Sequence, residues 1–503
     1  MTLAPPPADD PPPAMSVRAA ALWAILSQYA SFALQFATSI ILARWFISPE
    51  QLGQFSIAFA AVTLVAFLQD FGVTRYINGE RDLTPEKLQT AYTISVLFAW
   101  GVALLALAMA WFVAQFYDDA ALMPIALVIA ASYLLVPMAI VPQATCQRRM
   151  DYRSNTMIEV GSAVANAVTA LVLAIMGHGA LALAWGAFAQ QAARLVVSQW
   201  RVGGMLPWPL RMGDASSIVS LGGTNTVQVI CQTLTARAPE LVIGRLIDSA
   251  SVGLFARASG LALQLRLLVA GAVTGVFYPA FRRVRDSGEP LGPPYLRVVA
   301  AFTGVTWPAM AGIAVLAHPL IDFLYGERWL AAAPLLLWIA LSQLCYVALP
   351  LNADLPILLG RIRPLMRRMV AETIGSIVLI AITAPFGLVW VAASRLIHGL
   401  LWVAIYAPLL RGALDLRWRD LSLVWLRSAV VTLVAVAPLL ISYAVWNPPS
   451  FADLGQVASM TALGIALWFI SLRMVGHPLH EEIVGIAEGM LGTLHQRVRA
   501  PAK

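Results

Sequence analysis

Three arginines stand inside long runs of apolar residues, where a charge is unusual. Arg257 and Arg266 lie in the run 250–280, and Arg395 lies in the run 387–410. A guanidinium in apolar surroundings is costly unless it reaches water, a partner or a substrate. Guanidinium groups also bind phosphates in a bidentate manner. The three arginines therefore predict a cationic site for an anionic head group; the alternative for each is structural pairing, or snorkelling to the end of its helix.

Glutamines recur at helical spacing in two other apolar runs. Gln28 and Gln35 share a face of the first run, and Gln228 and Gln232 share a face of the seventh. Lipid cannot satisfy such amides, so these faces must turn inward. We expect them to line a cavity, and hydrogen bonding between helices is the alternative.

Two glutamates, Glu159 and Glu372, each begin an apolar run and follow a pair of arginines. Either could bind a coupling cation. The alternative is a carboxylate in the first helical turn, stabilised by the helix dipole and by nearby arginines. Glu240 and Asp248 flank the end of the seventh run, where we expect them to be solvated.

Catalytic and cofactor motifs are missing from the sequence. Neither lysine follows a glycine, so no Walker A loop exists. The three cysteines lie far apart in apolar runs, without metal or disulfide spacing. No loop is long enough for a soluble catalytic domain. We therefore expect no cofactor, no metal and no enzymatic activity.

The elements that carry these residues are predicted to be membrane helices. Of the 503 residues, 60% are hydrophobic and 12% are charged, and the mean hydropathy is +0.77. The apolar runs have the length of membrane spans. They predict an all-α polytopic membrane protein with about 14 helices, and twelve is the competing count. The approximate runs are 17–43, 52–74, 88–115, 120–144, 156–176, 179–200, 216–243, 250–280, 295–318, 330–352, 367–386, 387–410, 423–446 and 453–474.

Arginines concentrate in the breaks that follow the even-numbered runs. By the positive-inside rule these breaks, and both termini, are cytoplasmic. The excess of 33 basic over 26 acidic residues therefore reflects topology, and we expect no nucleic-acid partner. The Pro- and Asp-rich residues 1–15 predict a disordered cytoplasmic tail.

A weak internal repeat divides the chain. Arg148 precedes Glu159 by the same interval that separates Arg361 from Glu372, six runs apart. An even offset gives both halves the same orientation, as in parallel transporter repeats. We expect six-helix bundles at 16–200 and 215–410 around a central cavity, two further helices at 420–475 and a cytoplasmic tail at 476–503.

Four segments in order resemble the Wzx-type polysaccharide transporters of the MOP flippase superfamily. They are LAR with SPEQLG (42–53), IGR with VGLFARA (243–258), FYPAFRR (277–283) and LYGERW with AAPL (324–335). Among the subgroups the chain most resembles the colanic-acid-type exporters. Only Arg257, of the three arginines, falls within one of these segments.

The resemblance implies a function in the bacterial inner membrane. It implies that undecaprenyl-pyrophosphate-linked oligosaccharide crosses to the periplasmic leaflet by alternating access, with membrane lipid and polysaccharide polymerase or export proteins as partners. A multidrug exporter of the same superfamily is one alternative, although such exporters favour cationic drugs and acidic cavities. A glycosyl-polymerase or ligase is another, and that chemistry usually needs a large periplasmic loop.

Overall fold

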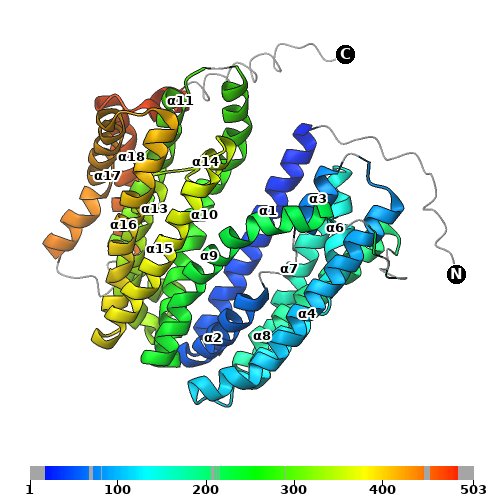
Figure 1. The fold of residues 1–503 in the computed structure, drawn as a ribbon. Coiled ribbons are helices and arrows are strands. Elements are labelled where there is room, and N and C mark those ends of the chain that lie inside the picture. The colour runs from blue at the N-terminus through cyan, green and yellow to red at the C-terminus, as the bar shows by residue number, and fades with distance from the viewer. Residues whose placement is uncertain are drawn as a thin grey trace, which may run out of the picture. The chain divides into compact units, whose positions relative to one another are not determined.

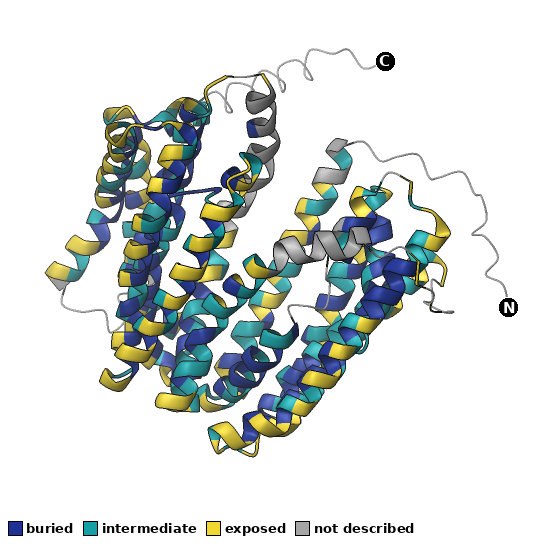
Figure 2. Ribbon diagram, in the orientation of Figure 1, coloured by how far each residue is buried: buried dark blue, intermediate teal, exposed yellow. Residues whose placement is uncertain are grey.

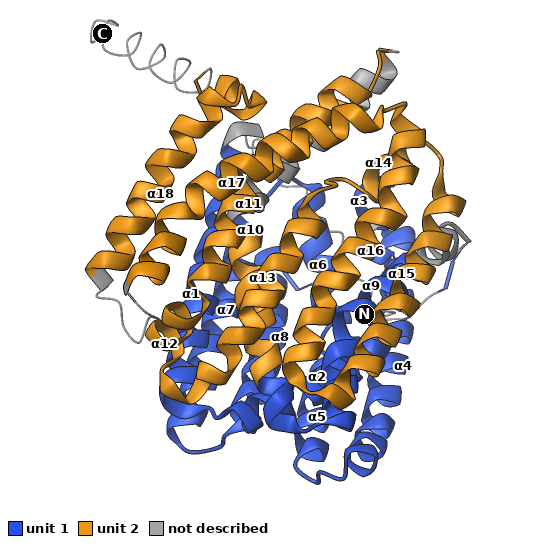
Figure 3. Cartoon of the chain, turned by 90° about the vertical axis from the view of Figure 1, so that its left-hand side faces the viewer, with its two compact units in different colours: residues 1–253 blue, residues 254–503 orange. Residues whose placement is uncertain are grey.

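Helices make up the regular structure of the part of the chain that is described (Figure 1). The computed structural model describes residues 17–66, 72–80, 82–204, 210, 212–213, 216–287, 289–446 and 454–484. They fall into two compact units, residues 1–253 and 254–503 (Figure 3). The predicted tail 1–15 and most of the predicted tail 476–503 lie outside the described residues.

Unit 1 is a bundle in which α7 packs on α8, α1 on α7, α4 on α5 and α2 on α9. A π-helical turn over Leu42–Phe46 ends α1. The helices are α1 (Val17–Ile41), α2 (Pro49–Ala66), α3 (Val73–Gly79), α4 (Pro85–Tyr117), α5 (Leu122–Ser132), α6 (Pro137–Arg148), α7 (Tyr152–Ile175), α8 (Ala180–Val202) and α9 (Ser216–Leu246).

In unit 2, α13 packs on α16, and α11 packs on both α13 and α17. The first residues of α10, up to Gly253, count with unit 1. The helices are α10 (Ser249–Asp286), α11 (Gly292–Val315), α12 (Ala317–Tyr325), α13 (Ala333–Val347), α14 (Asp354–Leu358), α15 (Ile362–Thr383), α16 (Leu388–Leu414), α17 (Trp418–Trp446) and α18 (Leu454–Met474). Short 3-10 turns precede α13 and follow α15.

Each of the fourteen predicted runs coincides with a helix, or with the bent pair α5 and α6, so the all-α membrane fold class is confirmed. Among the described residues, ten helices are long and apolar enough to cross a membrane by themselves. The pair α5 and α6, bent by 46°, makes eleven if it counts as one span. The other three runs correspond to α2, α9 and α10, and the count of fourteen spans stays a prediction.

The boundary between the units differs from the boundary of the predicted repeat. Helix α9, which the repeat assigns to the second half, packs on α2, α3 and α4 of unit 1. The predicted bundles at 16–200 and 215–410 follow sequence similarity, whereas the units follow packing. The repeat therefore remains a prediction.

Large apolar side chains lie on the outside of both units, as the exposed stretches of Figure 2 indicate. Leu104, Trp111, Ile382, Trp390 and Leu433 each expose 59–64% of their surface. A soluble protein rarely presents so many exposed apolar side chains together. These surfaces fit contact with lipid tails, which is the setting that the composition predicts.

The starts of α2 and α10 touch each other through two glycines. A Cβ atom on Gly53 would lie 1.6 Å from the Ser249 carbonyl oxygen, and one on Gly253 would lie 1.8 Å from the Pro49 carbonyl oxygen. Only glycine fits such a close approach of two main chains. The contact is reciprocal, because each glycine faces a main-chain carbonyl group at the start of the other helix.

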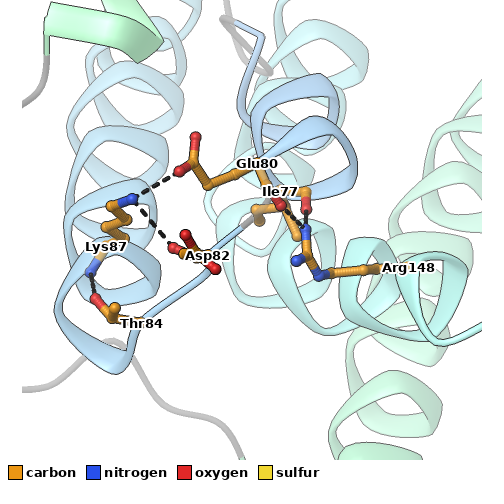
Figure 4. A network of polar contacts seen from close by, with 6 residues as sticks. All are labelled: Ile77, Glu80, Asp82, Thr84, Lys87 and Arg148. Atoms are coloured by element: carbon orange, nitrogen blue, oxygen red, sulfur yellow. Dashed lines mark hydrogen bonds and ion pairs between the residues drawn. The ribbon is translucent and has the colours of Figure 1, made fainter.

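A polar network fixes the connection between α3 and α4 (Figure 4). Lys87 Nζ lies 2.6 Å from Glu80 Oε1 and donates to the Asp82 carbonyl oxygen at 3.1 Å. Arg148, at the end of α6, donates to the carbonyl oxygens of Ile77 and Glu80. Arg148 thus satisfies carbonyls at the end of α3 that have no partner within the helix.

A buried histidine attaches the last two helices to α11. His477 Nδ1 accepts a hydrogen bond from the Leu479 N–H at 3.2 Å, so Nε2 carries the proton and donates to Ser428 Oγ at 3.0 Å. Ser428 Oγ lies 2.7 Å from Thr303 Oγ1 on α11. Burial lowers the pKa of His477 to about 4, and the nearby Arg427 guanidinium adds to the effect. The neutral imidazole is therefore the form that this chain of hydrogen bonds needs.

Candidate functional site

One face of α16, in unit 2, carries four side chains with polar groups or aromatic rings. Arg395, His398, Trp402 and Tyr406 follow at steps of three and four residues, so they share one side of the helix. This side packs against α13 and α15. The sequence of α16 therefore places a cation, an imidazole and two aromatic rings on the same interface.

Arg395 is held by two hydroxyl groups from neighbouring helices. Its Nη1 donates to Ser376 Oγ on α15 at 2.8 Å, and its Nη2 donates to the Tyr346 hydroxyl on α13 at 3.5 Å. Neither partner is charged. Arg395 is half-buried, and the interactions described for its guanidinium include no hydrogen bond to a carboxylate.

The hydroxyl of Tyr346 connects the arginine to an acid. It lies 2.6 Å from His398 Nδ1, and His398 Nε2 lies 3.7 Å from Glu372 Oε1. Tyr406 donates to Glu372 Oε2 at 3.0 Å. His398 Nε2 is buried and makes no hydrogen bond in the structure. The separation of 3.7 Å between Nε2 and the carboxylate is longer than a hydrogen bond.

Arg266 on α10 interacts electrostatically with the same Tyr346. The charge of Arg395 also acts on Tyr346. Two of the three arginines singled out from sequence thus interact with one phenol: Arg395 through a hydrogen bond at 3.5 Å and Arg266 through its charge. We call these residues, together with His398, Glu372 and Tyr406, the Tyr346 cluster.

Arg257 lies in a different environment. Its guanidinium carbon stands 4.8 Å from the centre of the Tyr325 ring and 5.1 Å from that of Trp329. Both rings are fully buried, at 1% and 0% exposure. The contacts join two of the segments that carry the family resemblance, VGLFARA and LYGERW. They give Arg257 a packing role through cation–π interaction, and its role in binding stays a prediction.

The repeat-related glutamates have different partners. Glu159 Oε2 pairs with Arg194 Nη2 at 3.0 Å, and its Oε1 accepts from Gln143 Nε2 at 2.6 Å. Glu372 has Tyr406 and His398 instead. Glu159 and Glu372 lie seven and ten residues past the starts of α7 and α15, so neither stands in the first helical turn. Glu159 is therefore ion-paired in unit 1, whereas Glu372 in unit 2 contacts Tyr406 and His398 and lies within electrostatic range of Arg395.

The four glutamines lie on accessible faces of α1 and α9. Gln28, Gln35 and Gln232 are exposed, and Gln228 is half-buried. Helix α1 packs on α7 by another side, where Thr156 Oγ1 donates to the Trp23 carbonyl oxygen at 3.3 Å. Cavity lining by the glutamines stays a prediction.

Sequence reasoning missed several residues of these clusters. Arg194 and Arg237 also lie inside long helices, and the criterion that selected Arg266 would have found them. Tyr346 and His398 carry no sequence signal, because tyrosine and histidine are ordinary in apolar helices. The expectation of a solvated Glu240 was wrong: the side chain is 15% exposed and pairs with Arg237.

Comparisons with known proteins agree with this fold and composition. The family described as "Polysaccharide biosynthesis protein" matches residues 41–334. The succinoglycan biosynthesis transport protein ExoT of Rhizobium meliloti is 27% identical over 347 residues, 67% of this chain and 68% of that protein. The lipopolysaccharide biosynthesis protein WzxC of Escherichia coli is 21% identical over 339 residues, with the same two shares.

Two solved structures share the fold over most of the chain. The lipid II flippase MurJ in an inward closed conformation has a TM-score of 0.70 at 13% identity, covering 90% of this chain and 98% of that one. An inward-facing multidrug resistance transporter of the MATE family has a TM-score of 0.57 at 14% identity, covering 78% and 98%. Both likenesses concern the fold alone.

Proposed function

Because the chain belongs to the polysaccharide biosynthesis protein family, we propose that it is a flippase for undecaprenyl-pyrophosphate-linked oligosaccharide repeat units. It moves them from the cytoplasmic to the periplasmic leaflet of the bacterial inner membrane, with both of its termini in the cytoplasm. The names of ExoT and WzxC, which place these relatives in polysaccharide transport or biosynthesis, support this proposal. Polysaccharide polymerase and export proteins are its expected partners.

The interaction of Tyr346 with two arginines, Arg395 through a hydrogen bond and Arg266 through its charge, is the observation that supports the substrate class. A lipid-linked oligosaccharide presents a diphosphate at the boundary between its apolar tail and its sugar. Guanidinium groups bind phosphate through parallel hydrogen bonds, and they do so more strongly away from water. Two arginines in one cluster of apolar helices favour this anion over the cationic drugs of multidrug exporters.

Glu372 supplies a site at which transport is coupled to a proton or another cation. Its carboxylate accepts a hydrogen bond from Tyr406 and lies beside the unbonded His398 Nε2. A proton on this pair removes the negative charge that competes with diphosphate for Arg395. Glu159, which is paired with Arg194, is the weaker candidate because its charge is already compensated.

The test is a flipping assay in proteoliposomes with fluorescent undecaprenyl-pyrophosphate-linked oligosaccharide. Losing one charge-assisted hydrogen bond costs about 1.5–3 kcal/mol, so Arg266→Gln and Arg395→Gln should each slow transport by roughly 10- to 150-fold. Arg417→Gln is the matched control, because Arg417 is exposed, lies outside the spans and pairs with Asp420. Arg395→Lys should restore part of the rate.

The same vesicles distinguish the multidrug alternative. A quaternary ammonium dye replaces the lipid probe, and no arginine-dependent uptake is expected. Dye transport without lipid flipping would overturn the proposed function. Unchanged lipid flipping in both arginine variants would instead show that the diphosphate does not bind at the Tyr346 cluster.

A further inference from the structure

A second charged pair lies in α9, within unit 1, and the Tyr346 cluster does not include it. Arg237 and Glu240 are three residues apart, so they project from the same side of the helix. Arg237 Nη1 lies 3.5 Å from Glu240 Oε1, and the guanidinium carbon lies 4.9 Å from the centre of the Phe59 ring on α2. The pair therefore sits at the packed interface of α9 with α2.

The carboxylate of Glu240 is incompletely satisfied. Its contact with Arg237 is longer than the 2.7–2.9 Å of a good charge-assisted hydrogen bond. Its other oxygen, Oε2, is buried and makes no hydrogen bond. An ionised carboxylate with an unbonded, buried oxygen is costly, and protonation relieves that cost.

Among the described residues, the groups around the pair supply no second cation for Glu240. Tyr133 lies within electrostatic range of Arg237. The Tyr117 hydroxyl donates a hydrogen bond to the Leu241 carbonyl oxygen at 2.9 Å, and Tyr117 lies within electrostatic range of Arg245 at the end of α9. The groups that face Glu240 are therefore one cation, Arg237, and neutral phenols beyond it.

Helix α9 is weakened at this point in the chain. Pro239, next to Glu240, has no N–H to donate and interrupts the main-chain hydrogen bonding of the helix. Bends at proline let one part of a helix shift against the other. A change in the charge of Glu240 therefore acts where the helix is easily reshaped.

We propose that the Glu240 carboxyl group is a proton-binding site whose occupancy controls Arg237. A proton from water binds the carboxylate at Oε2 and neutralises Glu240, while Arg237 keeps its charge and loses its ionic partner. The released guanidinium then becomes available to an anionic group. A metal ion fits less well, because the Arg237 cation repels it and the described residues contain no cluster of three His, Cys, Asp or Glu. This inference does not depend on which substrate the protein carries.

Infrared difference spectroscopy of the full chain in lipid bilayers tests the site without a substrate. Lowering the pH should produce the C=O band of a protonated carboxylic acid that is absent from Glu240→Gln. Glu50→Gln is the matched control, because Glu50 is exposed at the start of α2. Glu240→Asp should retain a band at a shifted frequency, which separates loss of the acid from misfolding.

Two further measurements complete the test. In Arg237→Gln the Glu240 band should persist to higher pH, because the cation that competes with the proton is gone. Identical pH-difference spectra in wild type and in Glu240→Gln would overturn the proposal. Loss of the band on adding sodium at constant pH would also overturn it, by assigning the site to a metal ion. Neither outcome touches the flipping assay, so the two proposals fail separately.

Discussion

The close approach of α2 and α10 gives the sharpest structural prediction. Gly53→Ala places a Cβ atom 1.6 Å from the Ser249 carbonyl oxygen, where ordinary contact needs about twice that separation. The obstacle is main chain, which cannot rotate away as a side chain does. The starts of the two helices must therefore separate by about 1.5 Å, or one helix must bend.

The expected cost follows from two opposing effects. Overpacking of a well-packed site typically costs about 1–3 kcal/mol, occasionally more. Alanine gains about 1 kcal/mol over glycine in helix propensity. A Cβ only 1.6 Å from main chain places Gly53→Ala at or above the upper end of the overpacking range, so we expect a net loss of about 2 kcal/mol or more of stability. Gly253→Ala should behave alike, because its Cβ would lie 1.8 Å from the Pro49 carbonyl oxygen.

Thermal unfolding of the purified protein in detergent, followed by tryptophan fluorescence, measures the effect. Gly260→Ala is the control, since a Cβ at Gly260 in α10 meets nothing within 4 Å and should leave Tm unchanged or raised. The double variant of Gly53 and Gly253 should cost less than the sum of the single changes, because one separation relieves both clashes. Equal Tm values for Gly53→Ala, Gly260→Ala and wild type would refute the contact.

Three further outcomes follow from other contacts. The neutral form of His477 makes its full contribution to stability above about pH 6.5, where the unfolded imidazole is also neutral. This contribution is lost as the pH falls toward 4. The Tm should therefore fall over that window, and it should fall less in His477→Gln. Trp329→Ala should lower the free energy of unfolding by about 3–5 kcal/mol, and therefore Tm, because it removes a buried ring that also contacts the Arg257 guanidinium. A smaller effect of Arg257→Met would show that packing of the ring dominates. Arg194→Gln leaves the Glu159 carboxylate without its cation; because the two side chains are 25% and 33% exposed, the change should cost about 1 kcal/mol. Adding Glu159→Gln should then recover part of the loss, and a double variant less stable than the Arg194 variant would contradict the pairing.

The helices could be predicted from sequence because each apolar run has one favourable arrangement in lipid. Main-chain groups there must bond within their own segment, so the period and length of a run fix the helix. The break at Pro385 and Gly387 is an example, because two separate helices, α15 and α16, flank it as expected. The short helices α3, α12 and α14 were missed, since so few residues give no clear periodicity.

The site could be predicted only in part. Composition alone makes an arginine in an apolar run conspicuous, so Arg266 and Arg395 were recognised. The contact of Arg395 with Tyr346 depends on the packing of α13 on α16, which sequence spacing within one helix does not encode. The same limit explains Glu240, whose burial is set by packing against α2 rather than by its place near the end of α9.

The sequence by itself determined that the chain is a helical membrane protein, where its helices run and which residues carry unusual charges. These are local properties, set by the cost of apolar groups in water and of charges in lipid. Tertiary structure decided which partner each charge has: rings for Arg257, hydroxyl groups for Arg395 and an arginine for Glu159. Partners on different helices are selected by packing, because the energy of a buried charge depends on the few groups within contact distance and not on its neighbours in the chain.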